Sequence, residues 1–299
     1  MIDVCLLGTG GMLPLPQRAL TSLYVRHNGH VLLIDCGEGT QTAIRSVGLR
    51  FKPIEAILIT HFHADHIAGL PGLLLTIGNQ GRTEPLTIYG PTGLAETVDA
   101  LRVIAPEIPY EIEYRELHTN EPTRFSCIGL EVDSIPLAHR VPCLGYCFTL
   151  LRKGKFNAKI AQEKGIPVSL WSRLQRGEAA GGFVPEDVLG SPRRGLSILY
   201  ATDTRPVPVI AEYGKDADLL ILEGIFGEKK KQERAELTCH MMMQEAAEIA
   251  CCANAKELWL THFSPAVPHP EEFSDEMRAI FSNTVVGRDG MFRTLRFDQ

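Results

Sequence analysis

Short apolar runs that end in polar, titratable residues recur along the chain. Residues 54–60 form a nearly continuous apolar run, typical of a buried strand, and lead directly into a histidine-rich segment at 61–66. The same pattern occurs in four further runs: 131–138 before His139, 196–202 before Asp203, 219–222 before Glu223, and 257–261 before His262. Core strands more often end in Gly, Asn or Pro turns. We therefore expect these five strand ends to serve a common function.

Helical segments are interspersed with these strands. Apolar residues at helical spacing mark two of them: Leu94, Val98 and Leu101 in one, and Met243, Ala247 and Ala250 in another, which we expect His240 to open. Strands and helices mixed without strict alternation predict an α/β protein with a layered arrangement. We predict a single domain over residues 1–299 that carries an inserted, basic, helical arm at 151–182.

Composition excludes several classes of protein. The chain has 299 residues, of which 44% are apolar and 22% charged, enough to bury a sizeable core. The formal net charge of −6 excludes a uniformly basic nucleic-acid coat, although it leaves room for a local basic patch. We expect no signal peptide, because no basic segment precedes the first apolar stretch. We also expect no membrane partner, since no apolar run reaches the roughly 18 residues that span a bilayer.

The eight cysteines give little sign of a disulfide framework, because none of them forms a Cys-x-x-Cys pair. Without an export signal, reduced thiols and a cytoplasmic location are the default prediction. Cys143 and Cys147 are spaced as two metal ligands could be, but their apolar surroundings favour buried structural thiols. The thioethers of Met241-Met-Met243 could bind a soft metal, but we interpret these residues as core packing at the start of a helix.

The segment His61-Phe-His-Ala-Asp-His66 contains three imidazoles and one carboxylate. Neutral imidazole is a preferred nitrogen ligand of zinc, and carboxylate is accepted as well. Alternate residues of an extended turn point the same way, so His61 and His63 can share one metal. Asp65 and His66 can then turn towards a second. The alternative is a solvated loop with incidental histidines, which this density of donors disfavours.

Two metals need more ligands than this segment holds. His139, Asp203 and His262, each at a predicted strand end, are the candidates. They complete two sets: His61, His63, His139 and Asp203 on one metal, and Asp65, His66, His262 and a bridging Asp203 on the other. A bridging carboxylate suits two metals about 3.5–4 Å apart. The remaining histidines away from these strand ends, His27, His30, His118 and His269, are predicted to lie at the surface.

The metal-ligand motif and several other strings of the sequence resemble those of a known family. The His-x-His-x-Asp-His motif after an apolar strand is shared by the metallo-β-lactamase superfamily. The wider text is similar to ribonuclease Z, the tRNA 3′-processing endonuclease, in these strings: Leu6-Leu-Gly-Thr-Gly10, Leu33-Ile-Asp-Cys-Gly-Glu-Gly-Thr-Gln41, Gly69-Leu-Pro-Gly-Leu73, His139-Arg-Val-Pro142 with Gly145-Tyr146, Asp203-Thr-Arg-Pro206 and Thr261-His-Phe-Ser264. The resemblance implies an αβ/βα sandwich with two mixed sheets, outer helices and the metals at one sheet edge.

The resemblance also implies a chemistry. Two zinc ions would supply a metal-bound hydroxide that hydrolyses an RNA phosphodiester bond, with manganese or iron also compatible with such ligands. Asp65 would orient and deprotonate the water. His240 resembles the family's proton donor to the leaving 3′-oxygen, held by Glu223; the alternative for His240 is a helix-capping role. A homodimer is implied by the family only.

The predicted arm is basic. Seven basic residues lie between 152 and 176 against the single acid Glu163, a local charge of +6. Phosphates attract such a patch, and the resemblance implies an arm that grips precursor tRNA through Arg173 and Arg176. Without the resemblance, this charge pattern would indicate a solvated, charged helix face that binds no partner.

Several substrate-side strings depart from the family. In the loop expected to read the tRNA 3′ end, only Pro14 and Arg18 match, and Arg18 is our candidate there. The segments around Glu223 and His240, and the one after Ser264, also differ. The metal ligands are complete while these strings have changed, so the sequence supports the hydrolase chemistry more firmly than the substrate.

The leading hypothesis, which the resemblance supplies, is a zinc-dependent tRNA 3′ endonuclease. The alternatives are a small-molecule phosphodiesterase or other ester hydrolase of the same fold, and a non-catalytic binding protein.

Overall fold

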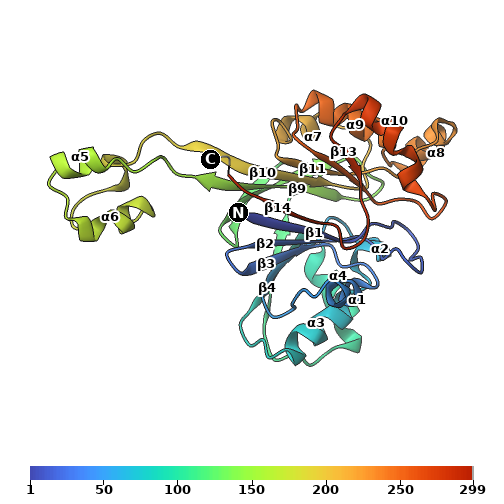
Figure 1. Ribbon diagram of the computed structural model, residues 1–299. Coiled ribbons are helices and arrows are strands. Elements are labelled where there is room, and N and C mark those ends of the chain that lie inside the picture. The colour runs from blue at the N-terminus through green and yellow to red at the C-terminus, as the bar shows by residue number, and fades with distance from the viewer. Residues whose placement is uncertain (298–299) are drawn as a thin grey trace. The chain divides into compact units, whose positions relative to one another are not determined.

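The computed structural model (Figure 1) describes residues 1–297, which form two compact units. The larger unit comprises Met1–Thr149 and the chain from Ser197 onward, and the smaller unit is Leu150–Leu196. The smaller unit thus contains the predicted insertion at 151–182 and also residues 183–196. No helix in the described part of the chain has the length and hydropathy needed to cross a membrane.

Two mixed sheets form the centre of the fold. Within residues 1–297, the first has the order β14 (Phe292–Leu295), β1 (Ile2–Gly8), β2 (Ser22–His27), β3 (His30–Ile34), β4 (Ile54–Leu58), β5 (Leu86–Pro91) and β6 (Ile112–Leu117). The second has the order β13 (Thr284–Val286), β12 (Leu258–Thr261), β11 (Leu219–Glu223), β10 (Arg193–Ala201), β9 (Cys143–Arg152), β8 (Leu130–Leu137) and β7 (Thr123–Cys127).

Each sheet has one helix-covered face. Cys5 and Leu7 of β1 join a core cluster with α1 (Thr40–Ser46), α3 (Leu70–Asn79) and α4 (Leu94–Leu101), which η1 (Arg102–Ile104) follows. Leu220 and Leu222 of β11 pack with α7 (Pro208–Tyr213), α9 (Met243–Cys252) and α10 (Ser274–Ile280). Because alternate strand residues point to opposite faces, the remaining buried positions face the other sheet. The predicted αβ/βα sandwich is confirmed (Figure 1).

The direction of the strands explains where polar residues gather. Strands β3 to β6 run parallel to one another, and so do β10 to β13. Parallel strands place their carboxyl ends at one edge of the sheet, where open α/β sheets form their sites. The strand ends before Asp203 and His262 therefore share one edge of the second sheet. The end of β4 before His61 lies at an edge of the first sheet, and His61 Nε2 approaches Asp203 Oδ1 to 3.8 Å across the two sheets. The short helices α2 (Ala64–Ile67) and α8 (Gln232–Thr238) complete this part of the fold.

The smaller unit has its own core. It contains α5 (Ala158–Glu163), α6 (Val168–Gln175) and the short η2 (Pro185–Asp187). Four buried side chains form its centre, with four aromatic and aliphatic side chains packed around them: Ala161, Ile166, Leu174 and Val188 within, and Phe156, Leu170, Trp171 and Phe183 around.

Two local expectations were wrong. His27 is buried rather than at the surface, and its Nδ1 lies 2.8 Å from the carbonyl oxygen of Met1, a partner that sequence spacing does not reveal. His240 does not open a helix either. Helix α9 has Met242 as its N-cap residue, and the Met242 amide donates to Glu245 at 2.8 Å, so the acid supplies the capping acceptor.

The cysteine and methionine interpretations agree with the structure. Cys143 and Cys147 are buried, free thiols. Met241, Met242 and Met243 are almost wholly inaccessible and belong to the core cluster of the second sheet. Cys143 Sγ lies 3.9 Å from His61 Nδ1 and 3.7 Å from the Thr202 carbonyl oxygen, so this thiol packs beside the site rather than among its donor atoms.

Candidate active site

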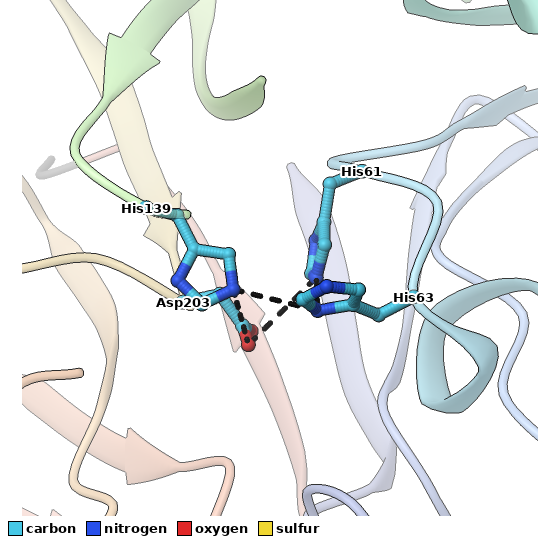
Figure 2. A group of neighbouring side chains, drawn as sticks. All are labelled: His61, His63, His139 and Asp203. Atoms are coloured by element: carbon cyan, nitrogen blue, oxygen red, sulfur yellow. Dashed lines mark hydrogen bonds and ion pairs between the residues drawn. The ribbon is translucent and has the colours of Figure 1, made fainter. Parts of the chain in front are cut away.

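Four donor side chains meet between the two sheets (Figure 2). His61 and His63 follow β4, His139 follows β8 and Asp203 follows β10. His61 Nε2 lies 2.9 Å from His63 Nδ1, and His139 Nε2 lies 3.4 Å from the same atom. Asp203 Oδ1 is 3.8 Å from His61 Nε2 and 4.0 Å from His139 Nε2. The structure brings together the first predicted ligand set.

A second donor group lies on the other side of Asp203. The Nε2 atoms of His66 and His262 are each 3.1 Å from Asp203 Oδ2. Asp65 Oδ2 lies 3.8 Å from His66 Nε2 and 3.6 Å from His262 Nε2. One oxygen of Asp203 thus faces each donor group, which is the arrangement that a bridging carboxylate requires.

The donors fit divalent metal ions. Asp203 Oδ2 is buried, and its nearest partners among residues 1–297 are the Nε2 atoms of His66 and His262 at 3.1 Å, neither of which makes a hydrogen bond with it. A buried carboxylate oxygen needs a balancing positive charge, which either protonated imidazoles or a metal ion can supply. Nitrogen and carboxylate donors in these two groups, within 4.8 Å of one another in each, match the ligand preferences of zinc and similar metals.

The first three histidines are electrically neutral. Burial lowers the pKa of His61 to about 2, and it also lowers the pKa values of His63 and His139. A metal ligand must be a neutral imidazole, so this group is ready to bind a cation without first losing a proton.

The second group binds protons instead. Burial opposes the charge on His66, but the carboxylates Asp203 and Asp35 outweigh it and raise the pKa of that imidazole to about 10. Burial likewise opposes the charge on His262, whose pKa Asp203 and Asp65 raise well above its usual value. Burial also disfavours the Asp203 anion, yet His262 and His66 hold the pKa of its carboxyl well below the usual range. Metal binding here would displace protons.

Sequence reasoning assigned no role to the residues that orient these ligands. Asp35 Oδ2 lies 2.8 Å from His66 Nδ1, and Thr60 donates to Asp35 from both its amide and its hydroxyl. His139 Nδ1 lies 3.1 Å from the Cys239 carbonyl oxygen. Each contact leaves the Nε2 atom free to face the site. Asp35 follows β3, so the strand-end pattern that identified the ligands also contained it.

The backbone is strained or crowded at several of these positions. Asp35, Asp203 and His262 adopt left-handed conformations with φ values of 59°, 57° and 56°. Such angles are uncommon for residues other than glycine and concentrate at functional sites. Gly11 passes so close to His262 that a Cβ atom there would lie 2.6 Å from the imidazole ring. The loop after β1 therefore requires glycine at this position.

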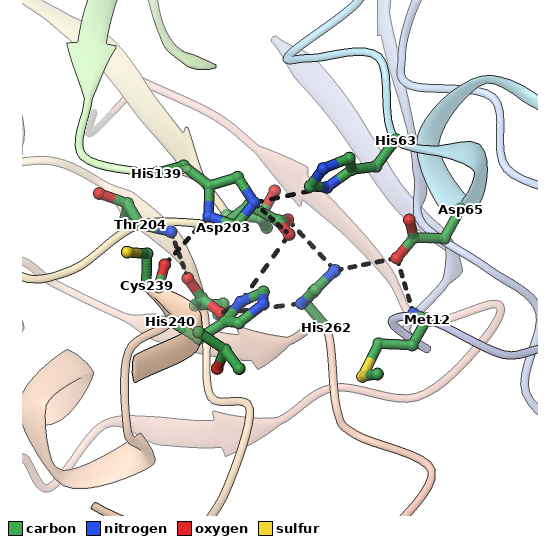
Figure 3. A network of polar contacts seen from close by, with 12 residues as sticks. Met12, His63, Asp65, His139, Asp203, Thr204, Cys239, His240 and His262 are labelled. Carbon is green, nitrogen blue, oxygen red and sulfur yellow. Dashed lines mark hydrogen bonds and ion pairs between the residues drawn. The ribbon is translucent and has the colours of Figure 1, made fainter. Parts of the chain in front are cut away.

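His240 lies beside these donors (Figure 3) and pairs with Glu223. His240 Nδ1 lies 2.8 Å from Glu223 Oε2, while the other oxygen, Oε1, accepts from the Thr204 amide at 2.5 Å. Burial disfavours imidazolium, but Glu223 outweighs it and raises the pKa of His240. His240 also lines a cavity of about 90 Å³ together with His63, Asp65 and Asp203.

The candidate substrate-binding arginines are engaged with the protein. The Arg18 guanidinium donates to the carbonyls of Val267 and Pro268 at 3.0 and 2.8 Å, and it lies 5.6 Å from the Phe263 ring centre. In the smaller unit, both Arg173 and Arg176 are exposed and pair with Glu178, at 3.4 and 2.9 Å.

Two sheets with outer helices and a histidine–aspartate cluster at one edge define the metallo-β-lactamase fold, and the model of that superfamily matches residues 16–142. Ribonuclease Z of Lachnospira eligens is 49% identical over 302 residues, which cover 100% of this chain and 99% of that protein. Ribonuclease Z of Clostridium acetobutylicum is 45% identical, with 100% and 99% covered. The crystal structure of human tRNase Z, short form, is similar with a TM-score of 0.72 and 25% identity, covering 99% of this chain and 100% of that one.

The chain belongs to the ribonuclease Z family. It is accordingly a metal-dependent hydrolase that acts on phosphodiester bonds, and the fold together with the histidine–aspartate cluster supports divalent metal binding.

Proposed function

We propose that this protein removes 3′ trailers from precursor tRNA as a metal-dependent endoribonuclease. The observation that carries the proposal is one cavity lined by members of both donor groups and by His240, which pairs with Glu223. The chain is also nearly half identical to ribonucleases Z. The donor groups supply a place for the phosphate, and the pair supplies a proton donor beside it.

The ligand assignment follows the two donor groups. His61, His63, His139 and Asp203 would hold one metal, and Asp65, His66 and His262, together with Asp203, would hold the other. Bound divalent ions lower the pKa of water and stabilise charge on phosphoryl oxygens. The nitrogen and oxygen donors favour zinc, and two ions per chain match the two groups.

Asp65 handles the attacking water. The Met12 amide donates to Asp65 Oδ2 at 2.6 Å and holds this carboxylate at the cavity. Burial disfavours its charge, but His262 and His66 outweigh that effect and lower its pKa. Asp65 is therefore ionised, so it accepts the hydrogen of the water and orients its oxygen towards phosphorus.

His240 serves the leaving group. As the new phosphorus–oxygen bond forms and the old one breaks, the 3′-oxygen gains negative charge and needs a proton. His240 carries one because Glu223 favours its imidazolium, and the ring borders the same cavity. General acids of this kind contribute about 10²–10⁴-fold to a rate.

The test is cleavage of a 3′-extended precursor tRNA beside hydrolysis of bis(p-nitrophenyl) phosphate by the zinc-loaded protein. We expect a cut directly after the discriminator base. Asp65→Ala should remove most of this activity, with retained metal measured alongside. Turnover of the small ester with intact precursor would instead favour a small-molecule phosphodiesterase, and unchanged turnover by Asp65→Ala would refute the role of Asp65.

Three finer expectations belong to the same proposal: zinc as the metal, a homodimer, and a cytoplasmic location. Elemental analysis of the purified protein tests the first and counts the ions. Light scattering coupled to size-exclusion chromatography tests the second, for which a mass near 33.0 kDa would mean a monomer. Fractionation of cells tests the third.

A further inference from the structure

An arginine–glutamate pair lies behind His240, outside the cavity. Arg205 follows the ligand Asp203 by two residues, and its amide donates to the Ala138 carbonyl at 3.0 Å. Its guanidinium donates to both oxygens of Glu245, at 2.9 and 2.5 Å. Only 24% and 18% of the two side chains are exposed. A bidentate pair of this kind fixes the relative position of its partners more strictly than a single bond.

The pair holds the backbone on which His240 is carried. Arg205 Nη1 donates to the His240 carbonyl at 2.5 Å, and Glu245 Oε2 accepts from the Met242 amide at 2.8 Å. The chain between α8 and α9 is therefore held at two points two residues apart. The Gln232 amide group, at the start of α8, donates to Glu245 Oε1 at 3.1 Å and adds a third attachment.

The same short segment holds the imidazole as well. Thr204 binds Glu223 through its amide, and Glu223 binds His240 Nδ1. Residues 203–205 thus provide a metal ligand, the orientation of Glu223, and the grip on the His240 main chain. The segment between α8 and α9 that carries His240 also contains a backbone conformation that is unfavourable for residues other than glycine, because Cys239 has a φ of 59°. The contacts of Arg205 and Glu245 hold this segment in place.

We propose that Arg205, with Glu245 as its partner, is the positioning residue for His240. This inference rests on the proposed function, in which His240 gives its proton to the leaving 3′-oxygen. Arg205 lies behind the proton donor and acts through the backbone. Proton transfer needs heavy atoms about 2.6–3.2 Å apart, and a shift of about 1 Å can cost about 10²-fold in rate. Without the Arg205–Glu245 pair, the His240 imidazole can still donate a proton, but its distance to the leaving 3′-oxygen is no longer fixed.

The leaving group distinguishes this role from a general structural one. The 3′-oxygen of RNA needs a proton as it departs, whereas p-nitrophenolate leaves as a stable anion. His240→Ala, the reference variant, should therefore lose precursor-tRNA cleavage by about 10²–10⁴-fold and lose far less with bis(p-nitrophenyl) phosphate. We call this difference, a large loss of tRNA cleavage beside a small loss of bis(p-nitrophenyl) phosphate hydrolysis, the substrate split. Arg205→Ala should show the same split, with a smaller loss of tRNA cleavage.

Three further variants sharpen the test. Arg205→Lys keeps one donor but not the bidentate fork, so its tRNA cleavage should lie between Arg205→Ala and the unchanged protein. Glu245→Gln, which is less disruptive than loss of the arginine, should show a weaker split. Arg205→Ala in the His240→Ala background should cost little more, because the two residues act through one proton donor. Arg124→Ala, which removes a bidentate partner of Asp133 away from the site, is the matched control.

Metal content and thermal unfolding are measured for every variant. Equal losses on both substrates in Arg205→Ala and Glu245→Gln would overturn the positioning role, and so would additive losses in the double variant. If His240→Ala itself lost both activities equally, the proton-donor assignment in the proposed function would fail, and this inference with it. A split for His240→Ala without one for the arginine variants would refute this inference alone.

Discussion

The donor residues of the larger unit and the arginines of the smaller unit lie in opposite surroundings. In the larger unit, His61 and His66 are completely buried, and Asp203 is 2% exposed. In the smaller unit, about half or more of each arginine side chain is exposed, 52% for Arg173 and 59% for Arg176, and both pair with an equally accessible Glu178. The candidate site fixes its donor residues by burial, whereas the smaller unit presents these arginines to solvent.

This difference explains why the sequence is informative in one unit and ambiguous in the other. Buried donors must have particular partners at particular distances, so a missing residue leaves an uncompensated charge. Exposed ion pairs contribute only about 0–1 kcal/mol, and screening weakens them further. A basic surface therefore tolerates many sequences as long as its overall charge remains. The expected effects of substitution should differ accordingly between the two units.

The largest effect should come from the carboxylate between the two donor groups. Asp203→Ala removes an oxygen from each group, so both metals should be lost and turnover of both substrates should fall more than about 10³-fold. Elemental analysis and the two activity assays check this. Asp133→Ala, at a similarly buried aspartate that pairs with Arg124, should keep metal and activity. Full metal content in Asp203→Ala would contradict the bridging position.

The next effect concerns the close approach of the first loop to His262. Gly11→Ala places a methyl group 2.6 Å from the imidazole ring, so the ring must move out of the second donor group. A displacement of about 1 Å should lower turnover about 10²-fold, with selective loss of one metal per chain. Gly190→Ala is the control, since its Cβ would meet nothing closer than 3.7 Å. Equal behaviour of the two variants would show that the ring adapts without cost.

The strand-end pattern predicted much of this site because the fold is built from parallel strands. Asp203 and His262 follow β10 and β12, whose carboxyl ends lie at one edge of the second sheet, and His61 follows β4 of the first sheet, which brings it within 3.8 Å of Asp203. Asp35 has the same position after β3, yet it stands alone in the sequence and its partner His66 is 31 residues away. The role that we infer for Arg205 depends on Glu245 and on the His240 carbonyl, 40 and 35 residues distant. Such tertiary contacts leave no periodic signal.

An intermediate effect should follow from Asp35→Asn. The aspartate accepts from His66 Nδ1. In the neutral imidazole that binds metal, this contact keeps the proton on Nδ1 and leaves Nε2, the atom that faces Asp203, free of hydrogen. An amide nitrogen at this place would favour the other tautomer and put hydrogen on the ligand atom. Loss of such an orienting partner typically costs about 10–100-fold in metal affinity or activity. A metal titration of the apoprotein measures it, with Asp133→Asn as control; affinity equal to that of the unchanged protein would show that Asp35 does not set the tautomer.

The smallest effect should be in the unit with exposed charges. Replacing Arg173 and Arg176 by alanine removes two cations that we expect to meet tRNA phosphates. The slope of log affinity against log salt is negative, and each lost contact should reduce its magnitude by about 0.7–0.9. Two lost contacts should therefore reduce it by roughly 1.4–1.8, with hydrolysis of bis(p-nitrophenyl) phosphate unchanged. Arg115→Ala, which removes a similarly exposed arginine paired with Glu113, should leave the slope as it is. An unaltered slope in the double variant would mean that these arginines form a solvated charged face, and that the metal site recognises its substrate without them.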